Sequence, residues 1–555
     1  MAAQNGQWRY KFDVVLFLVM IFNSHLSCMY VSGNFISGDH NESPGRNLSP
    51  DVTDSVDAVQ NNLTPNIVLI MADDLGWGDF GSYSPYTALT PNLDAIAKEG
   101  IRFTDFHVGS SVCTPSRGAL LTGRLGLRTG IVKHLTADAV GGIAENETTL
   151  AEILLDAGYR TGMFGKWHLG TQPGHQPLDK GFQTYLGIPY SVDMGCADPP
   201  GANYPSCPAC PYGNVSRMDP FPICTSDLAL PLYSDRTIIH QPAKLEELSD
   251  IFADFADEFI SQSTEPFFLY AALQHVHVPL AHGPMFGNIT GKGTFADTLL
   301  EMDWLVGRVV QAAMNHSRNT LVWILSDNGP WEMKCDLAGS CGPFAGKWQR
   351  DAQGGGGGGA QKNTVWECGH RVPSLVLWPD HVQPGSVSEA LVSSLDIMPT
   401  IAAILNISLP SDRFYDGINI QDILIGQSSV GHEVLFHPNS GSGGPDGEIG
   451  AVRIGDYKVV YYTGGSQDCD YNTGPTMSHF SSPLVFNIKN DPEEGTPLTV
   501  NSTEWLLAVQ AAEEALTSLE ISLQQDNTST VNYTTDPSVR PCCNIENSIC
   551  RCPWD

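Results

Sequence analysis

The sequence is poor in positive charge and in long apolar runs. Its 555 residues include 29 lysines and arginines against 61 aspartates and glutamates, for a formal net charge of -32. This acidic balance argues against nucleic acid or an anionic membrane surface as a partner. The longest apolar run, residues 14–22, falls well short of the ~20 residues that a membrane-spanning helix needs, so no transmembrane segment is predicted.

The beginning of the chain instead has the pattern of a secretory signal peptide. Arg9 and Lys11 precede the apolar run, and polar residues follow it. We predict a signal peptide over residues 1–30 and a flexible polar lead-in over residues 31–63. The candidate N-glycosylation sites, each in an Asn-x-Ser/Thr sequon, are Asn146, Asn214, Asn288, Asn406 and Asn501.

Most of the 14 cysteines of such a secreted chain are expected to form disulfides. Cys207 and Cys210 have the spacing of a redox motif, but no strand and helix flank them. The tail from Cys542 to Cys552 has a spacing similar to that of zinc sites, but an oxidising compartment favours disulfides there. We therefore interpret neither cluster as catalytic.

Apolar strands alternate with helices in the first two thirds of the chain. Strands are predicted at residues 66–71, 159–165, 265–273 and 320–326, and helices at residues 90–100, 148–157, 245–260 and 295–314. This alternation indicates an α/β fold in which helices cover both faces of a mostly parallel central sheet.

Polar side chains follow the carboxyl end of each of these four strands. They are Asp73 and Asp74, Lys166 and His168, His277, and Asp327 and Asn328. Because the ligand crevice of such sheets lies beyond the carboxyl ends of the strands, we expect these side chains to meet. The oxygen donors among them suit calcium or magnesium, whereas the lysine and the histidines suit an oxyanion. A sulfate or phosphate ester would need both.

The pattern changes after about residue 431. Short strands are predicted at residues 434–437, 451–454, 457–462 and 484–488, followed by a helix over residues 503–523. We therefore predict a catalytic α/β domain over residues 64–430. A smaller domain, an antiparallel sheet with a packed helix, is predicted over residues 431–555 and is expected to close one side of the cleft.

One cysteine stands apart from the others. Cys113 begins the run CTPSRGALLTGR. A lone Cys-x-Pro-Ser-Arg is compatible with a disulfide partner or a buried thiol, but the whole run resembles the signature of the sulfatases. That resemblance implies that Cys113 is oxidised to formylglycine in the endoplasmic reticulum. A formylglycine hydrate can attack a sulfate ester with one hydroxyl group and expel sulfate with the other, whereas a serine would need a second attack by water.

Other segments carry the same resemblance over nearly all of the chain from residue 63 onward. They are MADDLGWG from Met71, GYRTGMFGKWHLG from Gly158 and SDNGP from Ser326. The resemblance, to the sulfatases of the alkaline-phosphatase-like superfamily, implies an alkaline-phosphatase-like sheet sandwiched by helices. It also implies hydrolysis of sulfate monoesters with one calcium ion as cofactor.

The resemblance further implies a role for each site residue. The implied calcium ligands are Asp73, Asp74, Asp327, Asn328 and an oxygen at position 113. Arg117 and Lys166 would hold the formylglycine hydrate and the sulfate, and His168 would assist the loss of sulfate. His277 and Lys362 would bind sulfate and protonate the departing alcohol. The implied substrate-binding residues are Ser191, Lys166, His277 and Lys362.

Four further segments resemble one lysosomal branch of the family. They are GPFAGKWQ from Gly342, VWECGHRVP from Val365, LFHPNSG from Leu435 and YTTDPSVRPCCN from Tyr533. This resemblance implies location in the lysosome and a substrate that is 3-O-sulfated glucosamine in heparan sulfate, with another sulfated glycan or lipid as the alternative. It also implies the formylglycine-generating enzyme as a partner during biosynthesis.

The chain departs from the family pattern around Lys362. Six glycines, Gly354–Gly359, precede this lysine and are interpreted as a mobile loop. Lys347 is the alternative in the same role, but the spacing of Lys362 to the next acidic residue matches the family. Cys341 and Cys368 flank the glycine run, and we predict a disulfide between them, with a pair of free thiols as the alternative.

Two other classes of function fit the sequence less well. A phosphatase or phosphodiesterase of the same superfamily would have Ser or Thr at position 113 and histidine ligands for two zinc ions, whereas here Asn328 follows Asp327. A binding protein without catalysis would be expected to lack one of the charged residues named above, and none is missing.

Overall fold

The computed structural model describes residues 64–84, 89–212, 228–547 and 549–552. The predicted signal peptide, the whole of the lead-in and the sequon at Asn214 lie outside these ranges. Within them, no helix is both long enough and apolar enough to cross a membrane.

A ten-stranded sheet is the main element, in the order β11-β2-β10-β9-β1-β8-β4-β5-β6-β7. Its middle strands are parallel to one another: β9 (Thr320–Ser326), β1 (Asn66–Ala72), β8 (Phe267–Ala272), β4 (Arg160–Lys166) and β5 (Thr184–Ile188). Antiparallel pairings occur toward both edges, where β10 (Ser374–Leu377) pairs with β9 and with β2 (Ile101–Phe103), and β6 (Leu232–Ser234) pairs with β5 and with β7 (Thr237–His240). The edge strand β11 (Ser386–Ser388) is parallel to β2. The predicted mostly parallel sheet is confirmed.

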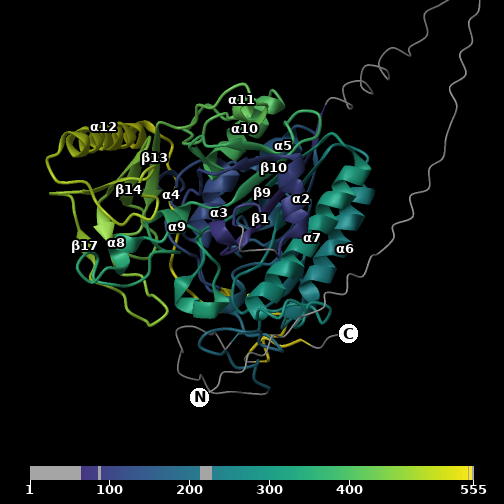
Figure 1. Cartoon of the computed structure of the whole chain (residues 1–555). Coiled ribbons are helices and arrows are strands. Elements are labelled where there is room, and N and C mark those ends of the chain that lie inside the picture. Colours follow the sequence, from purple (N-terminus) through teal and green to yellow (C-terminus); the bar gives the residue numbers. More distant parts are fainter. Residues whose placement is uncertain (1–63, 85–88, 213–227, 548, 553–555) are drawn as a thin grey trace, which may run out of the picture. The chain divides into compact units, whose positions relative to one another are not determined.

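Helices cover both faces of this sheet, as predicted. Because successive side chains of a strand point to opposite faces, Val68 and Ile70 of β1 enter one apolar core, and Ile67 and Leu69 enter another. The first core includes residues of α2 (Pro91–Glu99), α6 (Leu248–Ser261) and α7 (Thr294–His316). The second includes residues of α3 (Cys113–Thr122), α5 (Leu150–Asp156), α10 (Ile397–Ile404) and α11 (Gln421–Leu424). Figure 1 shows α6 and α7 side by side along the sheet.

The predicted C-terminal antiparallel sheet and its helix are also present. The sheet has the order β13-β14-β15-β18 and consists of β13 (Val434–Pro438), β14 (Ile449–Ile454), β15 (Tyr457–Val460) and β18 (Leu484–Asn487). Trp505 and Ala512 of α12 (Thr503–Gln525) share a core with Val452 and Val485 of the sheet (Figure 1). The shorter elements are β3 (Phe106–His107), β12 (Val392–Ser393), β16 (Tyr462–Thr463), β17 (Met477–Ser478), α4 (Gly126–Thr129), α8 (Lys347–Arg350) and α9 (Glu367–His370).

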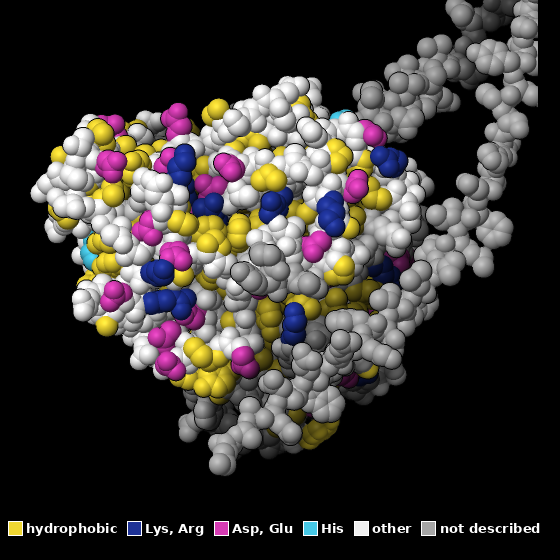
Figure 2. All heavy atoms as spheres, in the orientation of Figure 1, with side chains coloured by type: hydrophobic (Ala, Val, Ile, Leu, Met, Phe, Trp, Pro, Cys, Tyr) yellow, Lys and Arg dark blue, Asp and Glu magenta, His cyan; other side chains and the backbone are white. Residues whose placement is uncertain are grey.

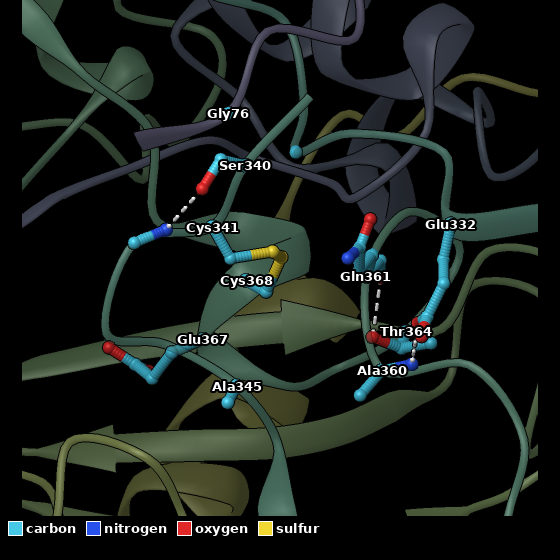
Figure 3. The surroundings of a disulfide bond; sticks show 12 residues. Gly76, Glu332, Ser340, Cys341, Ala345, Ala360, Gln361, Thr364, Glu367 and Cys368 are labelled. Atoms are coloured by element: carbon cyan, nitrogen blue, oxygen red, sulfur yellow. Dashed lines mark hydrogen bonds between the residues drawn. A yellow bond between two sulfur atoms is a disulfide. The ribbon is translucent and has the colours of Figure 1, made fainter. Parts of the chain in front are cut away.

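The disulfides agree with a secreted chain. The pairs in which both cysteines are described are Cys196–Cys210, Cys335–Cys469, Cys341–Cys368, Cys542–Cys550 and Cys543–Cys552. The bridge predicted between Cys341 and Cys368 is confirmed, with Cα atoms 5.3 Å apart. It joins the loop that carries Ser340 to α9 (Figure 3). The tail cysteines pair with one another, so the zinc interpretation stays excluded.

Removing the Cys341–Cys368 bridge is expected to destabilise the fold. Replacing both cysteines with alanine should lower the free energy of unfolding by about 3.5 kcal/mol, because the bridge closes a loop of 27 residues in the unfolded chain. Guanidinium titration would measure this. The matched comparison is the double alanine variant of Cys542 and Cys550, whose 8-residue loop predicts a loss of about 2.5 kcal/mol. An unchanged midpoint in the first variant would contradict the prediction.

The glycine run is held in place, which corrects the expectation of a mobile loop. The amide of Gly359 donates to the Ser466 carbonyl at 2.9 Å. Gly358 has φ +91°, and a Cβ there would lie 2.4 Å from the Thr473 carbonyl oxygen. Glycine is needed because the backbone is left-handed and packs directly on another backbone segment. Gly354–Gly359 is thus a packed connection to the loops of the C-terminal sheet.

The described surface carries charges of both signs. On the face shown in Figure 2, acidic and basic side chains are interspersed rather than gathered by sign. The predicted glycosylation sites that the structure describes, Asn146, Asn288, Asn406 and Asn501, are all exposed.

Candidate active site

The carboxyl ends of four neighbouring strands bring the predicted site residues together. Strands β9, β1, β8 and β4 are adjacent in the sheet. Asp73 and Asp74 follow β1, Asp327 and Asn328 follow β9, and Lys166 is the last residue of β4. All five are at most 4% exposed. The arrangement follows from the parallel order of the strands, which points every carboxyl end to the same edge.

Cys113 lies among them at the first position of α3, and it is the free cysteine of the described chain. Its Sγ lies 3.5 Å from Oδ1 of Asp73 and 3.3 Å from Nζ of Lys362. Burial raises the pKa of the Cys113 thiol, although Lys166 and Lys362 oppose this. An unmodified Cys113 would therefore be a protonated thiol and a poor nucleophile.

Two of the site carboxylates pair with lysines. Nζ of Lys166 lies 2.6 Å from Oδ2 of Asp73, and Nζ of Lys362 contacts Oδ1 of Asp74. Burial alone would raise the pKa of Asp73, but Lys166 and His277 are the main cations that hold it far below its ordinary value. Asp73 is therefore ionised across the physiological range and able to bind a cation.

Arg117 orients the third carboxylate. Its Nε and Nη2 atoms donate to Oδ2 of Asp327 at 3.0 and 2.8 Å, and Nη1 donates to the Lys166 carbonyl at 2.9 Å. All of these groups are fully buried, and the two charge-assisted hydrogen bonds to a single oxygen hold Oδ2 of Asp327 in place. The donors of Arg117 are thus directed to Asp327 and the end of β4 rather than to the sulfur of Cys113.

Asn328 has an unused oxygen at the site. Its Nδ2 donates to Oδ1 of Asp74 at 2.7 Å, but its buried Oδ1 has no hydrogen-bond partner. A buried oxygen without a hydrogen-bond partner lowers the stability of the fold unless a bound ligand contacts it. With the carboxylates of Asp73, Asp74 and Asp327, this oxygen makes a donor set that fits calcium or magnesium better than zinc.

His277 and Ser191 lie beside this donor set. Nε2 of His277 is 3.5 Å from Oδ2 of Asp74 and 3.5 Å from Oγ of Ser191. Lys166 donates to the same Oγ at 3.3 Å. The structure therefore places both residues where they could contact a group bound at the cations.

His168 forms no ion pair with another described residue. Its Nε2 lies 3.0 Å from the Leu135 carbonyl, and its Nδ1 is buried without a partner. Burial lowers the pKa of His168 well below its ordinary value, and Lys166 and Arg117 add to this effect. The ring is therefore neutral, and its unpartnered Nδ1 is free to accept a hydrogen bond.

The structure distinguishes the two candidate lysines. Lys362 is 6% exposed and contacts Cys113 and Asp74 at the site. Lys347 instead pairs with Glu493, and its side chain is 60% exposed. Lys362 is thus the lysine at the centre.

Sequence reasoning missed two residues beside the site. Asp193, two residues after Ser191, and Trp331, directly after the SDNGP segment, both line a cavity next to the cations. The Trp331 ring centre is 5.6 Å from that of His277 and 4.9 Å from Nζ of Lys362. Their positions directly after two site motifs were the available signal.

Comparison with known proteins decides the family. A family model described as Sulfatase matches residues 65–407, and one described as the C-terminal region of aryl-sulfatase matches residues 430–552. The chain belongs to the sulfatase family. Arylsulfatase G of Rattus norvegicus is 47% identical over 509 residues, covering 91% of this chain and 96% of that protein. Arylsulfatase A of Homo sapiens is 36% identical over 516 residues, covering 88% and 95%.

This sulfatase is a sulfuric ester hydrolase similar to arylsulfatase G. Its fold resembles that of the PsFucS1 sulfatase from Pseudoalteromonas sp., with a TM-score of 0.69 at 23% identity over 86% of this chain and 94% of that one. A phosphonate monoester hydrolase of Agrobacterium radiobacter shares the fold, with a TM-score of 0.52 at 16% identity over 83% and 96% of the two chains. The fold alone therefore does not distinguish a sulfatase from a phosphonate hydrolase.

A second buried cluster lies outside the active site. The rings of His370 and His437 stack at 4.2 Å, and those of His437 and His107 at 5.2 Å. His107, His437 and Glu367 have ligand atoms close enough for a metal, but Glu367 already contacts Lys458 at 3.1 Å and two arginines. Its charge is balanced without an ion, so we interpret the cluster as structural.

This cluster should make the fold less stable in acid. Burial lowers the pKa of His370 to about 3, whereas the unfolded chain takes up this proton near pH ~6.5. Above about pH 6.5, His370 is neutral in both states and does not lower the free energy of unfolding. As the pH falls toward 3, only the unfolded chain takes up the proton, and the free energy of unfolding has fallen by about 2 kcal/mol at pH ~5.

His370→Gln is expected to remove this part of the pH dependence. The fall in the free energy of unfolding between pH ~7 and ~5 should shrink by about 2 kcal/mol, even though the variant is less stable overall. Guanidinium titrations at both values would measure it, with the exposed His381→Gln as control. Equal pH dependence in wild type and both variants would contradict the assignment.

Proposed function

We propose that this sulfatase uses a formylglycine hydrate at position 113 as its nucleophile and one calcium ion as its cofactor. The observation that carries the proposal is the position of Cys113. A buried cysteine with a raised thiol pKa touches both a carboxylate, Asp73, and a cation, Lys362, of an oxyanion site. A thiol there is a poor nucleophile, but a geminal diol on the same carbon supplies two hydroxyl groups. The formylglycine-generating enzyme would make this aldehyde during biosynthesis.

The chain's own residues complete the reaction. Lys166 and Lys362 neutralise the sulfate as one hydroxyl group attacks its sulfur, and His277 donates a proton to the departing alcohol. The neutral His168, with its unpartnered Nδ1, accepts the proton of the second hydroxyl group as sulfate leaves and the aldehyde returns. Arg117 keeps Asp327 oriented throughout.

The four oxygen-donor residues would hold the cation. They are Asp73, Asp74, Asp327 and Asn328. The unpartnered Oδ1 of Asn328 supports this assignment because a cation would satisfy it. Calcium, when bound, would polarise the sulfate and lower the pKa of the attacking hydroxyl group.

The proposed substrate is 3-O-sulfated glucosamine at a non-reducing end of heparan sulfate, and the proposed location is the lysosome. Similarity to arylsulfatase G supports the substrate. The disulfides and exposed sequons support passage through the secretory pathway.

A panel of sulfated substrates tests this assignment. Sulfate release from 3-O-sulfated glucosamine is expected to exceed release from sulfated galactosamine and from cerebroside sulfate by at least about 10-fold in kcat/KM. Ion chromatography of free sulfate would measure the three rates. The opposite ranking would reject this substrate and leave the sulfatase assignment intact.

A further inference from the structure

A cavity of about 460 Å³ adjoins the sulfate-binding side chains. Trp331 forms part of its wall and also contacts His277 and Lys362. If these two residues hold the sulfate, the rest of the substrate would extend into this cavity. Its polar lining comes mostly from segments far apart in the chain: Asn363, Ser442, Ser466, Gln467, Tyr471 and Thr473. Loops of the C-terminal sheet therefore shape the space next to the nucleophile.

Asp193 is the one charged side chain among the described residues that line this cavity. It follows Ser191, whose Oγ lies 3.5 Å from His277 and 3.3 Å from Lys166. No ion pair joins Asp193 to any described residue, and its Oδ1 is buried without a hydrogen-bond partner. Burial would raise the pKa of Asp193, but His277, Ser191 and Lys166 together lower it, so the side chain is ionised.

An ionised carboxylate at this place is unsuited to the sulfate itself. Like charges repel, and the other carboxylates of the site are already paired with Lys166, Lys362 and Arg117. Ser191 hydrogen-bonds the carboxylate of Asp193, so Oδ1 is the oxygen that still lacks a partner, and a donor that arrives with the substrate would satisfy it. Hydroxyl and N–H groups next to the sulfate ester on a sugar ring are such donors.

We propose that Asp193 is a substrate-binding residue that accepts a hydrogen bond from a hydroxyl or N–H group of the sugar ring carrying the sulfate. The inference rests on the proposed function, because it concerns the same reaction and names which part of the substrate is recognised. The uncharged polar lining of the cavity receives the remainder of the ring. Asp193 thereby separates sugar sulfates from aryl sulfates, whose rings bring no such donor.

Two substrates and three variants test the proposal. The probes are 4-methylumbelliferyl sulfate, which has no neighbouring donor, and the methyl glycoside of 3-O-sulfated glucosamine. Loss of a hydrogen bond to a charged acceptor predicts a fall in kcat/KM for the sugar of about 10-fold in Asp193→Asn and about 100-fold in Asp193→Ala, mainly through KM. Turnover of the aryl sulfate should stay within about 3-fold of wild type in both. The control, Asp380→Asn, removes the same charge from an exposed site and should change neither.

The outcomes separate this inference from the proposed function. Equal losses with both probes would show a catalytic or structural role and overturn the inference, as would no loss with the sugar. If wild type cleaves the aryl sulfate and a different sugar sulfate, the glucosamine assignment fails, and the same comparison is then made with the sugar that is cleaved. A wild-type enzyme that cleaves no sugar sulfate overturns both.

Discussion

Cys113→Ala is expected to lower hydrolysis of sulfate esters by at least about 10⁴-fold, because it removes the carbon that can carry two hydroxyl groups. Cys113→Ser should be almost as inactive in turnover, since a serine has one hydroxyl group and cannot expel sulfate by returning to an aldehyde. Assays of sulfate release, with the mass of the tryptic peptide that contains residue 113, would measure the effect and its cause.

The loss should not come from unfolding. Alanine keeps the Cβ atom and removes only the atoms bound to it, at the first turn of α3, which costs about 1–2 kcal/mol of stability. Thermal unfolding of the variants would confirm that they are folded at the assay temperature. A fully active wild-type enzyme whose Cys113 is an unmodified thiol would disprove the mechanism.

Asp327→Asn is expected to remove the metal and to lower activity by about 10³-fold. The carboxylate is one of the four proposed ligands, and a neutral amide binds calcium less strongly. Asparagine is preferred to alanine in this test because Arg117 is fully buried and donates to Asp327 at 2.8 and 3.0 Å. Alanine would remove both of these hydrogen bonds and leave the buried guanidinium with only the longer contact to Asp73, at 3.6 Å, at a cost of about 3–5 kcal/mol.

Elemental analysis of the purified proteins would measure the metal. Wild type should contain one calcium ion per chain, and Asp380→Asn, at an exposed site, should retain it. Stoichiometric zinc without calcium or magnesium in active wild type would contradict the ligand assignment. So would an Asp327→Asn variant with full calcium content and full activity.

The four strands that carry the site could be predicted because each has a local signal. The four predicted strands coincide with β1, β4, β8 and β9 to within two residues at each end. Each is a buried, mostly apolar run that is followed by polar residues, so both the strand and its end could be recognised in the sequence. Strands β2, β5, β6, β7, β10 and β11 were not predicted. They are three to five residues long, too short for a period to show.

The helix that presents Cys113 was also missed. All ten residues of α3 are buried, so it has no polar face and no amphipathic pattern. Its end at Gly123, where φ is +67°, was visible only as a Gly-Arg turn in the motif. The motif indicated the chemistry of Cys113, while the burial that makes its thiol unreactive came from packing.

The sequence by itself determined which residues could form the site, because each follows a strand or lies in a short motif. Asp73, Lys166, Asp327 and Cys113 are all of this kind. The parallel order of the strands then makes their meeting a consequence of topology. The tertiary structure alone decided the pairing of each carboxylate with its cation.

The tertiary structure also decided which lysine reaches the nucleophile and where the neighbouring cavity lies. Lys347 and Lys362 are both compatible with the local pattern, and the packed glycine run directs Lys362 inward. Asp193 and Tyr471 face the same cavity across almost 280 residues of chain. Such contacts depend on how the loops of the two sheets pack against each other, and no periodicity or motif records that packing.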